Sequence, residues 1–171
     1  SLRVRLRISF QKCLPAMLTL VIGNKNYSSW SLRAWLVLTE FGVKFDEVRL
    51  LMDTPEFAEV IQRWAPNRRV PALHDNDLVV WDSLAICEYV NERFLDGRGW
   101  PADVAARAHA RSASAEMHSG FMAVRKQMPM NMRRMPDNYR WDAEADKDIA
   151  RIQQIWRELR SPFWSAMTKA V

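Results

Sequence analysis

"LTLVIGNKNYSSWSLRAWLVLTEFG", residues 18–42, holds an apolar run, a polar junction and an amphipathic segment in that order. The run at 18–23 predicts a strand. The helical spacing of the apolar residues after the junction predicts a helix over about 30–41, ended by Gly42. Ser28, Ser29 and Ser31 occupy the junction. Their hydroxyls either cap the helix or hold a reactive group, and this stretch alone leaves both interpretations open.

The residues after Gly42 continue the alternation of strands and helices. Strand patterns lie at 45–51, 70–74 and 78–81, and helix patterns lie at 54–64 and 83–94. Thr54 and Pro55 fit the start of a helix, and Asp75-Asn76-Asp77 fits a hairpin turn. The order is therefore βαβαββα. We expect two βαβ crossovers to make part of the sheet parallel, and the closing hairpin to add an antiparallel edge.

The remaining residues predict a separate helical unit. "LDGRGWPADV" at 95–104 interrupts the pattern with two glycines and a proline. After it we expect one long helix at about 102–128, then a loop, then a helix at about 142–160 interrupted by Pro162. The fold class is α/β plus all-α. We expect an extension at 1–16, an α/β domain at 17–95, a linker at 96–104 and a partial helical domain at 105–171.

Charge and hydropathy argue against two classes of partner. Arg3, Arg5, Arg7 and Lys12 supply four of the five net positive charges, so the body of the chain is nearly neutral and nucleic-acid binding is not expected. No apolar run approaches the roughly 20 residues that span a membrane. Residues 1–16 read as a targeting peptide, as an edge strand, or as sequence upstream of a true start at Met17.

The cysteines and histidines indicate neither a disulfide nor a metal site. Cys13 and Cys87 are the only cysteines, and neither belongs to a CxxC pair. This favours a reducing compartment and argues against dithiol redox chemistry. His74, His109 and His118 show no ligand spacing, so we expect no metal.

Two further stretches have both a structural and a functional interpretation. Pro71, at the start of a strand, is ordinarily a trans proline at a sheet edge. Asp82 and Ser83 end a strand and open a helix, so Ser83 is a natural cap. Alternatively, Ser83 and the free N–H groups of that helix take a ligand carboxylate, while Asp82 meets an amine.

Taken together, these stretches resemble the glutathione transferases. The residues that carry the likeness are Ser28-Ser29-Trp30-Ser31 followed by Arg33, "VPAL" at 70–73 and "DSLAICEYV" at 82–90. The serine stretch is most similar to the zeta class, which includes maleylacetoacetate isomerases. The resemblance covers about residues 18–128.

The resemblance implies a thioredoxin-like N-terminal domain, a helical C-terminal domain and a cytoplasmic homodimer. It implies that glutathione lies with its γ-glutamyl end on Asp82 and Ser83. Its cysteinyl backbone would pair with Val70 across a cis-Pro71, and its sulfur would point at the first helix beside Trp30. The helical domain is shorter than in full members, and we expect it to be truncated.

The chemistry of a thiol agrees with that placement. A thiol is mostly protonated at neutral pH, and the thiolate is the nucleophile. The N–H groups of a first helical turn and a hydroxyl donor stabilise the anion. By the family pattern Ser28 is the activating residue and Ser29 the alternative, while Ser31 and Arg33 shape the turn. The competing interpretation is that Ser28 or Ser29 only caps the helix.

The sequence thus predicts a glutathione transferase that activates the thiol for addition to a small electrophile or for isomerisation. The alternative is a non-catalytic member that binds glutathione or another ligand. A thiol-dependent reductase is disfavoured because no cysteine occupies the helix start. The electrophile would lie between the domains. His118, Met122 and Arg125, at i, i+4 and i+7, either face it or belong to the core.

Overall fold

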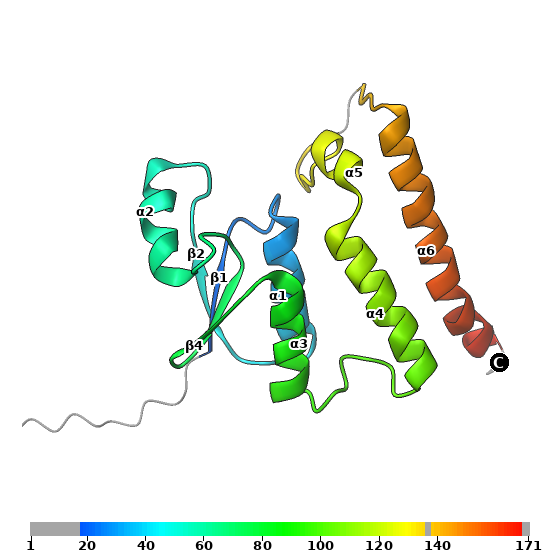
Figure 1. The fold of residues 1–171 in the computed structure, drawn as a ribbon, viewed down its shortest axis with the longest axis horizontal. Coiled ribbons are helices and arrows are strands. Elements are labelled where there is room, and N and C mark those ends of the chain that lie inside the picture. Colours follow the sequence, from blue (N-terminus) through cyan, green and yellow to red (C-terminus); the bar gives the residue numbers. More distant parts are fainter. Residues whose placement is uncertain (1–17, 136–137, 169–171) are drawn as a thin grey trace, which may run out of the picture.

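The computed structural model describes residues 18–135 and 138–168, so the expected extension at 1–16 lies outside the described residues. A mixed sheet with three helices forms one part of the molecule, and three further helices lie beside it (Figure 1). The elements of the first part are β1 (Leu18–Ile22), α1 (Ser29–Glu40), β2 (Asp46–Arg49), α2 (Pro55–Trp64), β3 (Ala72–Asp75), β4 (Leu78–Trp81) and α3 (Ser83–Phe94). The second part holds α4 (Val104–Ser119), α5 (Met122–Gln127) and α6 (Ala143–Thr168).

The sheet has the strand order β2-β1-β3-β4 and contains one parallel pair. β1 and β2 run parallel through the α1 crossover, whereas β1–β3 and β3–β4 are antiparallel. The expected second parallel crossover was wrong. Ala72, at the start of β3, pairs with Val21 near the end of β1, so the chain enters β3 at the same end of the sheet at which it left β2. α2 therefore does not return the chain to the opposite end.

Alternating side chains of β1 divide the core into two layers. Leu18, Leu20 and Ile22 pack with buried residues of α1 and α3. Val21 points to the other face, where it packs with Ile61 of α2. This two-residue period is what a strand covered on both faces requires. The result is a sheet with α2 on one side and α1 and α3 on the other.

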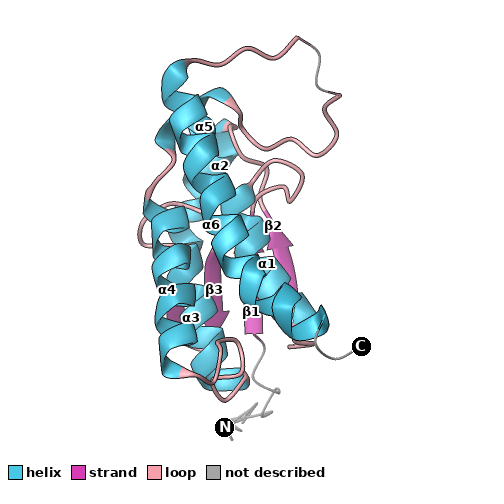
Figure 2. Ribbon diagram, turned by 90° about the vertical axis from the view of Figure 1, so that its right-hand side faces the viewer, coloured by secondary structure: helices cyan, strands magenta, loops and turns pink. Residues whose placement is uncertain are grey.

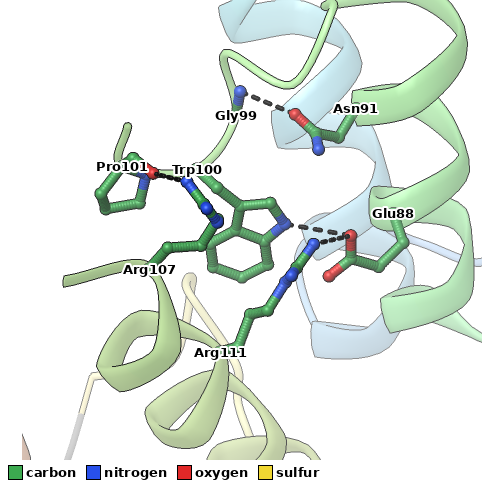
Figure 3. A network of polar contacts seen from close by, with 7 residues as sticks. All are labelled: Glu88, Asn91, Gly99, Trp100, Pro101, Arg107 and Arg111. Carbon is green, nitrogen blue, oxygen red and sulfur yellow. Dashed lines mark hydrogen bonds and ion pairs between the residues drawn. The ribbon is translucent and has the colours of Figure 1, made fainter. Parts of the chain in front are cut away.

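The connection from α3 to α4 is held against α3 (Figure 3). Asn91 accepts a hydrogen bond from the Gly99 backbone N–H at 2.8 Å, and its own carbonyl accepts from Gly97 at 3.1 Å. Glu88 accepts from the Trp100 indole at 3.0 Å and pairs with Arg111 of α4 at 3.5 Å. Arg107 of α4 donates to the Pro101 and Ala102 carbonyls, so side chains of both helices fix the connection that leads into α4.

The expected long helix over 102–128 is two helices. α4 ends at Ser119 with Gly120 as its C-cap, and Phe121, with φ 64°, is in the left-handed region and buried. A residue with a side chain in that conformation interrupts the α-helical path, so α5 starts in a new direction. α4 and α6 are joined by Glu116 and Arg151, whose two hydrogen bonds measure 2.7 and 2.8 Å.

α6 also differs from the expectation. Its helical backbone continues past Pro162 to Thr168, whereas the sequence predicted an interruption there. Proline removes one backbone donor but need not end a helix when the turns on either side stay bonded. In Figure 2, α4 and α6 lie in front of α1 and α3, with the sheet behind them. None of the helices in the described part of the chain has the length and apolar character to span a membrane.

Candidate active site

A closed network of serines forms the start of α1. Ser28 is the N-cap of α1 and only 6% exposed, and its hydroxyl donates to the Ser31 hydroxyl at 2.9 Å. Ser28 also accepts from the Ser31 backbone N–H at 3.5 Å. Ser31 is fully buried and accepts from the Gly23 N–H at 3.0 Å. These two serines therefore fix the turn between β1 and α1.

Ser29 is placed differently from its neighbours. It is the first residue of α1 and half-buried, and its hydroxyl bonds to no other described residue. Ser28, Ser29 and Trp30 line a cleft of about 540 Å³, together with Val70. The residues that the sequence predicted at the helix start thus line one cleft. Of Ser28 and Ser29, only Ser29 has a hydroxyl that makes no hydrogen bond to another described residue.

Val70 and Pro71 bound the cleft from the sheet side. The peptide bond between them is cis, as the resemblance implied. Pro71 is buried, while Val70 lines the cleft. The pairing of β1 with β3 begins only at Ala72, so Val70 precedes the ladder. An extended ligand in the cleft would lie along this backbone.

Asp82 and Ser83 are not in that cleft. Asp82, rather than the expected Ser83, is the N-cap of α3, and one oxygen accepts from Leu84 N at 2.8 Å and Ala85 N at 3.3 Å. Its other oxygen lies 3.1 Å from His118 Nε2. Asp82 is the N-cap because its carboxylate reaches the amides of the first turn and carries the negative charge that the helix N-terminus favours.

Ser83 faces a second cavity. This cavity, about 640 Å³, lies between α1, α3, α4 and α6 and is lined mainly by apolar side chains. Ser83 is 2% exposed, and its hydroxyl has no hydrogen-bond partner among the described residues. The structure therefore separates Ser83 from Ser29 and Val70, which the sequence had placed around one ligand.

Trp30 is the centre of a group of cations. The Arg33 and Arg125 guanidiniums lie 4.5 and 4.6 Å from its ring centroid. His118 meets the same ring edge-on, with centroids 5.2 Å apart. Burial, and then the charge of Arg125, lower the pKa of Arg33, and burial lowers the pKa of Arg125. Neither arginine forms an ion pair with a described carboxylate.

The cleft includes residues that sequence reasoning missed. Arg68 and Arg69 line it, as do Asp53, Met128 and Met130. Arg68 and Arg69 directly precede "VPAL", so their position in the chain was a usable signal. Met128 and Met130 come from the loop after α5, and nothing in their local pattern indicated where that loop would lie.

The proposed face of His118, Met122 and Arg125 holds only in part. The break at Phe121 removes the i, i+4, i+7 relation, and Met122 is 68% exposed. Arg125 nevertheless reaches the cleft, and His118 reaches Asp82. Residues 18–135 and 138–168 contain no group of three or more His, Cys, Asp or Glu side chains that could hold a metal.

Comparisons with known proteins agree with the fold described above. A sequence profile of the glutathione S-transferase N-terminal domain matches residues 27–93. A probable maleylacetoacetate isomerase of Caenorhabditis elegans is 34% identical over 96 residues, which are 56% of this chain and 44% of that protein. The chain spans between 21% and 45% of the length of the curated relatives it matches.

Solved structures show the same fold. A theta class glutathione S-transferase from Xanthomonas axonopodis pv. citri with glutathione bound has a TM-score of 0.60 at 23% identity, covering 86% of this chain and 70% of that one. A glutathione transferase homologue from Burkholderia with bound glutathione has a TM-score of 0.55 at 26% identity, covering 81% and 80%. The expected fold class is therefore confirmed: a thioredoxin-like sheet domain followed by a helical C-terminal domain.

Proposed function

Because residues 27–93 belong to the glutathione S-transferase N-terminal domain family, we propose that this chain binds glutathione in the α1 cleft and activates its thiol. The thiolate then adds to a small electrophile, or adds reversibly and so isomerises a double bond. The observation that carries the proposal is the cleft itself. It places Ser28, Ser29 and Val70 around one opening at the N-terminus of a 12-residue helix.

The start of α1 supplies the sulfur site. Amide N–H groups of a first helical turn and the partial positive charge of the helix end favour an anion there. Ser28 donates its hydroxyl hydrogen to Ser31, whereas the Ser29 hydroxyl is free to donate to the sulfur. We therefore assign Ser29 as the donor to the thiolate and Ser28 as the residue that fixes the turn. Each unit by which the thiol pKa falls corresponds to about 1.4 kcal/mol.

The rest of the tripeptide has matching groups in the cleft. Glutathione carries two carboxylates and one ammonium, so it is a net anion at neutral pH. Arg68 and Arg69 supply cations at the cleft, against the single carboxylate of Asp53. The backbone of Val70, which precedes the β1–β3 ladder, is available to pair with the cysteinyl residue.

The γ-glutamyl end is assigned to the start of α3. The Ser83 hydroxyl has no hydrogen-bond partner in the described part of the chain, and a carboxylate bound at this helix N-terminus would provide one. Asp82 would meet the ammonium group. Because Ser83 faces the second cavity, this assignment needs its own variant, and we expect Ser83→Ala to weaken glutathione binding while leaving the bound thiol's pKa unchanged.

Three further features are proposed on the family resemblance alone. They are a homodimer, a cytoplasmic location and the division into a glutathione-binding domain at 17–95 and a helical domain at 105–171. Whether the whole protein conjugates or isomerises its electrophile is also part of the proposal.

The pKa of bound glutathione tests the sulfur site directly. Thiolate absorbance near 240 nm, followed against pH at saturating glutathione, gives that pKa. In Ser29→Ala it rises by about 1 unit because a charge-assisted hydrogen bond is lost. Ser112→Ala, on the exposed side of α4, is the matched control and leaves the pKa unchanged.

Turnover is measured with 1-chloro-2,4-dinitrobenzene. The thiolate forms a C–S bond to the ring, the C–Cl bond breaks and chloride leaves with the electron pair. We expect Ser29→Ala to lower kcat far more than it weakens glutathione binding in calorimetry. If the intact chain gives no heat with glutathione, the proposal fails. An unchanged thiol pKa in Ser29→Ala, with a rise in Ser28→Ala, would transfer the donor role to Ser28.

A further inference from the structure

Arg125 enters the cleft from α5. It follows the left-handed Phe121, and its Nε–H donates to the Gly120 carbonyl at 3.0 Å. Its Nη2 donates to the Met117 carbonyl. These two bonds anchor the guanidinium at the end of α4, and its carbon lies 4.6 Å from the Trp30 ring centroid. Arg125 is therefore held in place before any ligand arrives.

The anchored guanidinium still has hydrogen-bonding capacity. Of five N–H donors on an arginine, two are used by the Gly120 and Met117 carbonyls. Arg125 makes no ion pair with the described carboxylates. Asp148 acts on it only from a distance, since its oxygen accepts from the Ala123 and Val124 amides at 3.0 and 3.1 Å.

Arg33 is a second cation beside Trp30 that forms no ion pair with a described carboxylate. Arg33 stacks on the same indole at 4.5 Å. The two guanidiniums repel each other, and both are partly desolvated. Partly buried charges in proteins are ordinarily paired, because desolvation without a partner is costly. The position next to Trp30 therefore favours an anionic ligand group.

The glutathione carboxylates have other partners in the proposed function. One is assigned to the start of α3 and the other to Arg68 and Arg69. Arg125 instead lies on the helical side of the cleft with Val124, Met128 and Met130, and these three provide an adaptable apolar wall. A molecule lying here beside the sulfur would contact both the apolar wall and the guanidinium.

We propose that Arg125 is a specificity-determining residue, which binds a carboxylate on the electrophile and so selects anionic acceptors with an apolar body. This inference rests on the proposed function, because it requires glutathione in the same cleft. Trp30 and the Gly120 and Met117 carbonyls fix the guanidinium, and Arg125 lines the cleft. A neutral acceptor of the same shape gains only the apolar contacts.

Two stable conjugates test the selectivity without turnover. S-(4-carboxybenzyl)glutathione and S-(4-carbamoylbenzyl)glutathione have nearly the same shape and differ in one charge. Calorimetry on the intact chain should show about 10- to 100-fold tighter binding of the carboxy compound, as expected for a hydrogen bond to a charged group. Arg125→Gln should abolish this preference. Lys126→Gln removes the same charge from the neighbouring exposed residue and should leave the preference intact.

S-methylglutathione separates this inference from the proposed function. If the wild-type chain binds S-methylglutathione but binds the two conjugates equally, the inference about Arg125 is wrong and the glutathione site stands. An equal loss of preference in Arg125→Gln and Lys126→Gln also overturns it. If S-methylglutathione does not bind, the proposed function fails first. If Arg125→Gln does not fold, equal binding of the two conjugates by the wild-type chain still overturns the inference.

Discussion

Ser31→Ala should destabilise the fold more than any other serine change at the start of α1. The Ser31 hydroxyl is fully buried and bonds to two donors, the Gly23 N–H at 3.0 Å and the Ser28 hydroxyl at 2.9 Å. Alanine removes the shared acceptor and leaves both donors without it. An unsatisfied buried polar group costs about 1–3 kcal/mol, so the two together amount to about 2–6 kcal/mol.

Urea denaturation followed by tryptophan fluorescence measures this loss. With a slope of about 2 kcal/mol per M, the midpoint should fall by about 1–3 M. Ser29→Ala is the matched comparison, because the half-buried Ser29 hydroxyl bonds to none of residues 18–135 and 138–168, and its midpoint should move by less than about 0.3 M. If Ser31→Ala shifts the midpoint no more than Ser29→Ala does, the serine network does not stabilise the junction and the assignment of Ser28 to a fixing role loses its basis.

Two further predictions concern ionisable groups away from the cleft. Burial raises the pKa of the Cys87 thiol to about 11, so at pH 8 its thiolate fraction is only about 0.1%. In a Cys13→Ser background, iodoacetamide labelling followed by mass spectrometry should therefore be slow in the native state and fast in urea, and rapid native labelling would contradict the burial of Cys87. Hydrogen bonds from Arg151 lower the pKa of Glu116, so their pair contributes stability above the unfolded-state pKa of about 4.3 that is lost as the pH falls through the lower folded-state value. Urea midpoints across that acidic range should fall for the wild type and stay flatter in Glu116→Gln; parallel curves would show that the pair adds nothing.

Local patterns predicted the elements of the sheet domain well, because each of its signals lies within a few residues. Thr54 caps α2 as expected, and its hydroxyl accepts from Phe57 N at 3.2 Å. The apolar run at 18–23 predicted the strand that the structure has as β1. The sequence did not show that β3 enters from the same end of the sheet as β2 leaves, because that depends on how α2 packs rather than on any residue of β3.

The helical part was harder to predict because its breaks have no composition signal. Phe121 is an ordinary helix residue by propensity, yet it takes a left-handed conformation where its ring is buried. Pro162 is a strong helix breaker by propensity, yet α6 continues through it. At Phe121 the burial of the ring overrides the local preference, and at Pro162 the helical backbone continues despite it.

The site shows the same limit. The sequence placed Ser28, Ser29, Trp30 and Val70 together, and the structure brings them to one cleft. It also assigned the cap of α3 to Ser83, but the side chain of Asp82 reaches the free amides. For Arg125 the sequence left two interpretations open, a face toward the electrophile or a place in the core. The contact between Arg125 and Trp30 depends on the break at Phe121. On a continuous helix, Arg125 would have been aligned with His118 at i, i+7.

The anchoring of the connection after α3 has a consequence for how such a protein changes over generations. Asn91 and Glu88 set the position of the segment that leads into α4, and α4 in turn carries the two carbonyls that hold Arg125. A substitution at position 88, 91 or 100 removes a contact that positions the start of α4, and it changes no residue of the cleft. Substitutions far from the cleft can therefore change the proposed acceptor preference. Differences in preference between relatives need not arise from cleft residues alone.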